Sequence, residues 1–351
     1  MARRDVAIVA YAQHASARED GRNEVEMLLP VVDQVLGRTG LRVEDLGFVV
    51  SGSSDYLAGV PFAFVSALDA IGPWPPIAES HVEMDGAWAL YEAWVRLQHG
   101  DVDTALVYAF GKSSPGELPR VLALQLDPYS AAPLFPDSIS LAGLQARMLL
   151  ESGGATERDL ADVVARSLRD AVSNPSAQRS GEPTVEELLT APMFADPLRR
   201  HDCPPISDGA AAVVLAAGDR ARELCERPAW IRGIDHRIEP PALGLRNLAD
   251  STSARAAAAN AGVGDGPVDV AELTAPFSHQ ELILRRAIGL NGHTRINPSG
   301  GALASNPVMV AGLVRFGEAA SRIFEGQAAR AVAHATSGPC LQQNLVGVLA
   351  S

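Results

Sequence analysis

The order strand, helix, strand occurs twice in this chain of 351 residues, and the duplication restricts the fold more than any other feature. Residues 5–13 have the apolar, β-rich composition of a buried strand, residues 24–38 have helical spacing of apolar side chains, and residues 45–54 form a strand entering a loop. A helix ending near Gly100 and a strand at 104–110 complete the first set. Helix 251–262, strand 269–277, helix 308–326 and strand 330–338 repeat the order.

Two such sets predict an α/β protein with two similar halves. Each half is expected to form a mixed, mostly parallel sheet with right-handed crossovers and helices on both faces, and a ligand site at the carboxyl ends of its strands. We place the halves at residues 1–217 and 218–351. The first half contains an excursion, residues 113–200, with a helix at 157–172 and a capping box of Thr184 and Glu187.

Charge and composition exclude several classes of partner. The net charge of −13 opposes binding to nucleic acid or to an anionic membrane surface. No apolar run is long enough for a membrane span, and residues 1–20 lack the pattern of a signal peptide, so we expect a cytoplasmic protein. The three cysteines lack metal-ligand spacing, and the adjacent His201, Asp202 and Cys203 do not suit one ion, so no metal is expected.

The segment TVEELLTAPMFADPLRRHDCPPISDGAAAVVL, residues 184–215, carries the most specific pattern in the chain. With GDVDTALVYAFGK at 100–112 and INPSGGALASNP at 296–307, it resembles the thiolase superfamily, in particular sterol carrier protein-type thiolases and thiolase-like lipid-transfer proteins of sterol side-chain catabolism. The resemblance covers nearly the whole chain. It implies two five-stranded halves in αβαβα layers, and an excursion that grips coenzyme A.

The resemblance also implies four catalytic loops, of which three are altered. The nucleophilic cysteine of the family would fall at or beside Glu83, yet the chain has no cysteine before Cys203. Thr274 replaces a water-binding His or Asn, and Asn306 replaces the activating histidine. Cys340 remains where the family has its acid–base cysteine.

Each candidate has a functional and a structural interpretation. Cys340 is a proton donor to carbon or an inert buried thiol. Glu83, with the neighbouring Asp85, is a general base or part of a helix start. His279 is a substitute base or a histidine that only bonds its neighbours, and Asn306 is an oxyanion donor that cannot move a proton.

The glycine-rich loop has two interpretations as well. Ser299, Gly300 and Gly301 bring backbone amides close to a pantetheine or thioester, and they allow close packing of a helix start on the sheet; we expect both.

We therefore predict an acyl-CoA-processing protein that forms no acyl-enzyme. The favoured reaction is retro-aldol cleavage of a β-hydroxyacyl-CoA, with a steroid side-chain thioester as the candidate substrate. A non-catalytic subunit or an acyl-CoA or lipid-binding protein that supports an active partner is the alternative, and a conventional acetyl-CoA acyltransferase is the least favoured. The only coenzyme expected is coenzyme A, as part of the substrate. The expected assembly is a homodimer, or a heterodimer with a second thiolase-like subunit, with an OB-fold and zinc-ribbon protein as a further partner.

Overall fold

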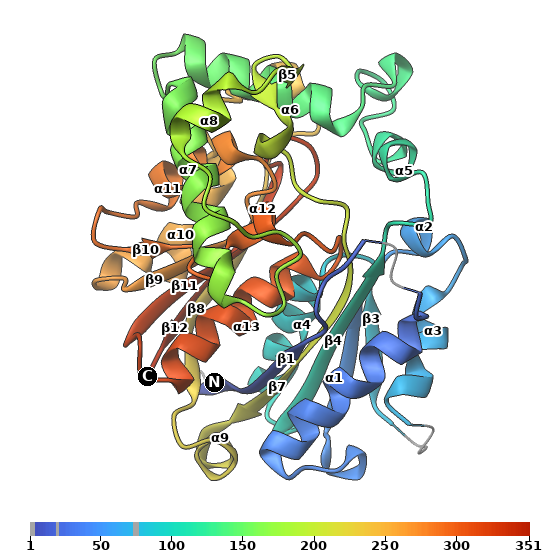
Figure 1. Ribbon diagram of the computed structural model, residues 1–351. Coiled ribbons are helices and arrows are strands. Elements are labelled where there is room, and N and C mark those ends of the chain that lie inside the picture. Colours follow the sequence, from blue (N-terminus) through green and yellow to red (C-terminus); the bar gives the residue numbers. More distant parts are fainter. Residues whose placement is uncertain (1–3, 19–20, 73–76) are drawn as a thin grey trace.

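The computed structural model describes residues 4–18, 21–72 and 77–351 of the chain (Figure 1). Within these residues the first half has strands β1 (Val6–Gln13), β2 (Phe48–Gly52), β3 (Glu79–Val82), β4 (Thr104–Lys112) and β7 (Asp208–Ala217). Its helices are α1 (Glu24–Thr39), α2 (Asp55–Ala58), α3 (Ala63–Ala67) and α4 (Gly86–His99).

The second half follows the same plan. Its described strands are β8 (Ala229–Ile238), β9 (Val270–Leu273), β10 (Arg295–Ile296), β11 (Arg330–Ser337) and β12 (Gln343–Ala350). Its helices are α9 (Gly218–Leu224), α10 (Thr252–Ala261), α11 (Ser278–Ile288), α12 (Gly301–Ala304) and α13 (Ala311–Phe324).

The strand order shows the duplication directly. In the described part of the chain the sheet runs β10-β9-β11-β12-β8-β1-β7-β4-β2-β3, so the two halves have the same order outward from the central pair. That pair, β1 and β8, is antiparallel and joins the halves through Ala7 opposite Trp230 and Ile8 opposite Ala229. The second strand of each half along the chain, β2 or β9, is parallel to both of its neighbours in the sheet. The last strand of each half along the chain, β7 or β12, is antiparallel to both of its neighbours. The predicted two-half α/β fold is confirmed.

The hydrophobic core divides into layers that follow from this symmetry. One buried cluster contains α4, α13 and the facing side chains of strands from both halves, so these two helices form the middle layer. A second cluster holds α1 against the outer face of the first half, and a third holds α10 and α11 against that of the second half. The middle helices are apolar on several sides because sheet strands cover both of their faces.

The excursion leaves the sheet at the end of β4 and returns at the start of β7. It contains α5 (Leu118–Leu124), α6 (Ser138–Glu151), α7 (Glu157–Asp170) and α8 (Val185–Thr190), and the short pair β5 (Met193–Ala195) and β6 (Leu198–Arg199). The predicted capping box at the start of α8 is confirmed. Figure 1 shows this segment, mostly green, at the top of the molecule.

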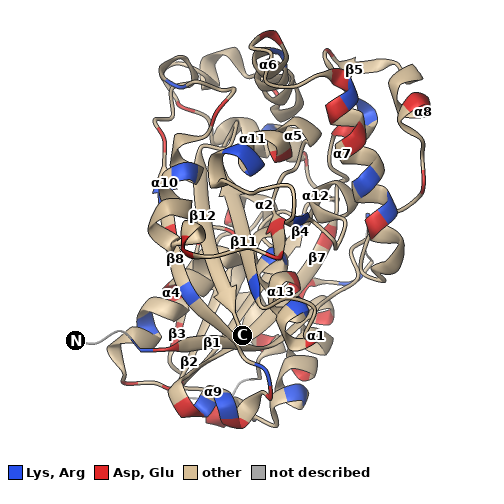
Figure 2. Cartoon of the chain, turned by 90° about the vertical axis from the view of Figure 1, so that its left-hand side faces the viewer, with Lys and Arg blue, Asp and Glu red and all other residues tan. Residues whose placement is uncertain are grey.

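Charged side chains lie mainly on the outer helices. Figure 2 shows both signs on α7 and α9, while most of the central strand surface carries neither colour. No helix in the described ranges is long and apolar enough to cross a membrane. The same ranges contain no group of three histidine, cysteine or acidic side chains placed to hold a metal ion.

Candidate active site

Four loops at the ends of strands meet at one cavity of about 280 Å³ beneath the excursion. They supply Asp85 before α4, Thr274 after β9, Asn306 before α13 and Cys340 between β11 and β12. These residues are separated by up to 255 positions, 340 minus 85, so only the folded sheet brings them together.

Asp85 links the two middle helices. It is the N-cap of α4, where its Oδ1 accepts a hydrogen bond from the backbone N–H of Ala87 at 2.8 Å. The same oxygen accepts from the N–H of Leu313 at 3.1 Å, and Oδ2 accepts from that of Gly312 at 2.9 Å, both in the first turn of α13. Burial raises the pKa of Asp85, although the three amides favour its ionised form. Asp85 is thus an anchored carboxylate that reaches the cavity.

Asn306 lies at the tip of the SGGALASNP loop and is partly exposed. Its backbone N–H donates to the Ser207 hydroxyl at 3.1 Å, which ties the tip to the strand returning from the excursion. Three residues on, the Met309 carbonyl accepts a hydrogen bond from the N–H of Gly86 at 2.9 Å. The side-chain amide lines the cavity and makes no hydrogen bond with another described residue. It is therefore open to a ligand.

Cys340 lies in a loop of unusual backbone conformation. Cys340 and Leu341 have φ angles of +54° and +59°, which side-chain-bearing residues rarely adopt. The guanidinium of Arg246 donates to the Cys340 carbonyl at 3.2 Å and to the Pro339 carbonyl at 3.0 Å, and so holds this loop. The Cys340 thiol donates to the Leu141 carbonyl at 3.5 Å.

Burial raises the pKa of Cys340 to about 11, while the charge of Arg246 acts in the opposite direction. The thiol is accordingly protonated at neutral pH. The protonated thiol is a weak nucleophile, because nucleophilic attack requires the thiolate.

Thr274 lines the same cavity but is nearly buried. Its hydroxyl donates to the His334 carbonyl of the neighbouring strand at 3.0 Å, so the hydroxyl proton is already committed. Thr274 offers the cavity a hydrogen-bond acceptor.

The structure places His279 and Glu83 away from the described lining of the cavity. His279 is fully buried in α11, its Nε2 lies 3.1 Å from the Gln145 side-chain oxygen, and burial lowers its pKa to about 3. Glu83 is exposed and accepts a hydrogen bond from the backbone N–H of Asp55 at 2.8 Å. The difference between Glu83 and Asp85 arises because only Asp85 starts the buried helix α4.

Ser299, Gly300 and Gly301 are buried and are not among the described residues that line the cavity. The Ser299 hydroxyl donates to Glu272 at 2.7 Å and accepts from the Arg315 guanidinium at 2.7 Å, within a buried ion pair of those two residues. A Cβ on Gly300 would lie 2.6 Å from a neighbouring Cβ, which indicates close packing of the helix start. The structural interpretation accounts for what is seen of this loop.

Sequence reasoning missed several lining residues. Cys203, within the matched segment 184–215, lines the cavity, and burial raises the pKa of its thiol to about 12. Gln280, next to His279, also reaches the cavity. The helical spacing of Leu118 and Leu122 was the available signal for an apolar wall on α5.

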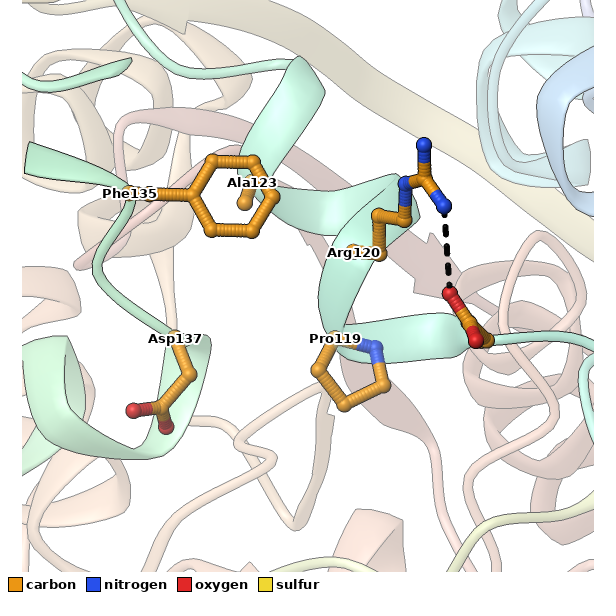
Figure 3. Close-up of a pocket in the computed structure, with 6 residues that line it drawn as sticks. Pro119, Arg120, Ala123, Phe135 and Asp137 are labelled. Carbon is orange, nitrogen blue, oxygen red and sulfur yellow. Dashed lines mark ion pairs between the residues drawn. The ribbon is translucent and has the colours of Figure 1, made fainter. Parts of the chain in front are cut away.

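A second hollow of about 400 Å³ lies on the other side of α5, with Pro119 lining both spaces. Figure 3 shows its lining, in which Arg120 forms an ion pair with Glu117 at 3.5 Å. Asp137 on the opposite wall caps α6 through the N–H groups of Ile139 and Ser140. Each of these charged groups already has a partner in the chain.

Comparisons with known proteins agree with this architecture, although no family model matches the chain. The acetyl-CoA acetyltransferase of Methanothermobacter thermautotrophicus is 34% identical over 53% of this chain and 57% of its own length. The 17-hydroxy-3-oxo-4-pregnene-20-carboxyl-CoA lyase of Mycobacterium tuberculosis is 27% identical over 67% of this chain and 63% of its own. The steroid side-chain-cleaving aldolase of Thermomonospora curvata is 24% identical over 62% and 58%.

The chain thus matches between 57% and 63% of the length of these curated relatives. A solved structure described as "Ltp2-ChsH2(DUF35) aldolase" superimposes with a TM-score of 0.79 over 99% of this chain and 98% of the other, at 18% identity, which shows a shared fold. In sequence the chain is thus similar to acetyl-CoA acetyltransferases, sterol carrier protein 2 and steroid side-chain-cleaving aldolases, and this similarity supports the predicted resemblance to thiolase-like proteins of the lipid-transfer type.

Proposed function

We propose that the chain cleaves a β-hydroxyacyl-CoA by a retro-aldol reaction, without a covalent acyl-enzyme. The observation that carries the proposal is Asp85, a carboxylate at the start of α4 that lines the cavity, two residues after Glu83, at or beside which the resemblance places the nucleophilic cysteine. A carboxylate there suits removal of a proton better than acyl transfer. Two relatives named as a lyase and a side-chain-cleaving aldolase support the same class of reaction.

In the proposed reaction the Asp85 carboxylate takes the proton of the substrate β-hydroxyl. The bond between the α and β carbons breaks, its electrons form the thioester enolate, and the β carbon leaves as a ketone or aldehyde. The Asn306 amide donates to the enolate oxygen, a type of contact worth about 10²–10³ in rate. The Cys340 thiol protonates the α carbon, and solvent returns the proton from Asp85 to the Cys340 thiolate.

The raised pKa values fit these two roles. A carboxylate with a raised pKa is a stronger base than a free aspartate, provided that it is ionised. A thiol with a pKa of about 11 stays protonated until a strongly basic enolate forms next to it. This scheme assigns no role to His279 or Glu83. The side chain of Asn306, and not the backbone amides near Gly301, donates the hydrogen bond to the enolate oxygen.

The substrate and the assembly belong to the same proposal. The names of the two relatives point to steroid side-chain CoA thioesters as the first substrates to test. The matched structure is described as Ltp2 with ChsH2(DUF35), so we propose that this chain also works with a partner subunit.

A non-catalytic subunit is the second candidate. It is favoured by the three amides that occupy both oxygens of Asp85, because a carboxylate used in this way is a less available base. In this case the chain would hold an acyl-CoA and support an active partner.

The deciding experiment purifies the chain with its co-expressed neighbours and measures cleavage of β-hydroxyacyl-CoA thioesters, with thiolysis of β-ketoacyl-CoA as the control. Cleavage without thiolysis, abolished by Asp85→Asn in this chain, supports the proposal. Cleavage that survives Asp85→Asn, Asn306→Ala and Cys340→Ser in this chain supports the non-catalytic subunit. Thiolysis accompanied by an acylated cysteine would refute both.

A further inference from the structure

The cavity carries one ionisable charge and no balancing cation. Asp85 is the single acidic or basic residue among the described residues that line it. The remaining lining is neutral and largely apolar.

Helix α5 provides much of the apolar wall. Leu118 and Leu122, four residues apart, present one face of α5 to the cavity, and Leu126 continues this face just beyond the helix. Ile139 and Phe277 line it from other elements. We call the three leucines the α5 wall.

The arginines nearest the cavity are engaged with other groups. Arg315, whose charge lowers the pKa of Asp85, is buried in an ion pair with Glu272 at 3.0 Å, and Arg179 donates to the Cys203 carbonyl at 3.1 Å. The two terminal N–H groups of Arg246 donate hydrogen bonds to the backbone carbonyls of Cys340 and Pro339. Arg120 faces the other hollow, where it pairs with Glu117 (Figure 3). A carboxylate on the bound acyl group would therefore lose its hydration beside Asp85 without gaining a cation.

We propose that the cavity accepts an uncharged, apolar acyl group and discriminates against acyl-CoA thioesters whose acyl chain ends in a carboxylate, with the α5 wall as the determinant. The inference rests on the proposed function only in taking the cavity as the acyl site. Burying an unpaired charge next to a like charge is among the most costly changes in a protein interior.

The test compares binding of two thioesters that cannot be cleaved, octanoyl-CoA and the mono-CoA thioester of octanedioic acid, by calorimetry with the full chain in its complex. Both lack a β-hydroxyl, so their binding is independent of the retro-aldol reaction. We expect the Kd of the carboxylated thioester to be higher by about a hundredfold, as for two desolvated like charges. Equal Kd values, or no binding of either probe, would overturn the proposal.

Two variants on α5 locate the determinant. Leu122→Arg places a cation in the wall and should reduce or reverse the preference, by about tenfold or more as expected for a partly buried ion pair. Leu124→Arg is the matched control, because Leu124 is 58% exposed on the same helix and is not among the described lining residues. If both variants shift the preference equally, a general change of net charge is responsible and the α5 wall is not the determinant.

If the binding preference holds but β-hydroxyacyl-CoA is not cleaved, the proposed reaction fails while the inference about the acyl group stands.

Discussion

Replacing Asp85 by asparagine separates its proposed chemical role from its structural role. Oδ1 of Asp85 accepts from Ala87 and Leu313, and Oδ2 accepts from Gly312. An asparagine whose carbonyl takes the place of Oδ1 keeps two of these three bonds. The lost bond costs about 1–3 kcal/mol.

The neutral side chain also removes a cost. Because burial raises the folded-state pKa of Asp85, the folded protein favours the protonated carboxyl, and the contribution of Asp85 to stability falls as pH rises from the unfolded pKa through the folded pKa. Asparagine lacks this loss at neutral pH. The two effects oppose each other, so we expect the free energy of unfolding of Asp85→Asn to lie within about 2 kcal/mol of that of the wild type. Asp85→Ala, which leaves all three amides without an acceptor, should lose about 3 kcal/mol or more.

Activity should respond differently. Loss of a general base lowers the rate by about 10²–10⁴, which corresponds to about 3–5 kcal/mol of transition-state stabilisation. Urea unfolding measured beside single-turnover cleavage of a β-hydroxyacyl-CoA distinguishes the roles. An Asp85→Asn protein that folds like the wild type and cleaves at the wild-type rate would refute the assignment of Asp85 as the base.

Three further substitutions test the surroundings of the site. Arg246→Met removes the charge that opposes the burial of Cys340, so the thiol pKa should rise beyond about 11 and peptide-resolved alkylation of Cys340 near pH 9 should slow; an unchanged rate would show that the guanidinium does not influence the thiol. His279→Gln should leave kcat unchanged but make the unfolding free energy less sensitive to acid. Burial lowers the pKa of His279 from 6.5 to about 3, so the stability that the neutral histidine contributes is lost as pH falls through this window, with a slope of up to about 1.4 kcal/mol per pH unit. Urea unfolding at several pH values measures this slope. Gly300→Ala, with a φ of +93° and a neighbouring Cβ at 2.6 Å, should lower the unfolding free energy by about 1–3 kcal/mol, whereas Gly292→Ala has open space and should change it little; equal thermal shifts would contradict the packing role.

Local patterns in the sequence predicted the architecture well. The repeated strand and helix periodicities correspond to β1, α1, β2, α4 and β4 in one half and to α10, β9, α13 and β11 in the other. The capping box at Thr184 was predicted because it depends on residues three positions apart. Patterns of this kind are local, so they survive without knowledge of the rest of the fold.

The composition of the site was only partly predictable. Asn306, Cys340 and Thr274 were placed on loops that do converge on one cavity. The leucines of α5 and Cys203 were missed because the excursion and the segment that follows it reach the cavity only through tertiary contacts, which no local pattern reports.

By itself, the sequence determined that the chain has two related halves and no cysteine before position 203. Only the tertiary structure decided which of two carboxylates, Glu83 or Asp85, reaches the cavity. Asp85 does so because its oxygens bind N–H groups at Gly312 and Leu313, more than two hundred residues away in the chain, whereas Glu83 is exposed to solvent. A side chain that caps two helices from different halves acquires its environment only when those halves have packed together.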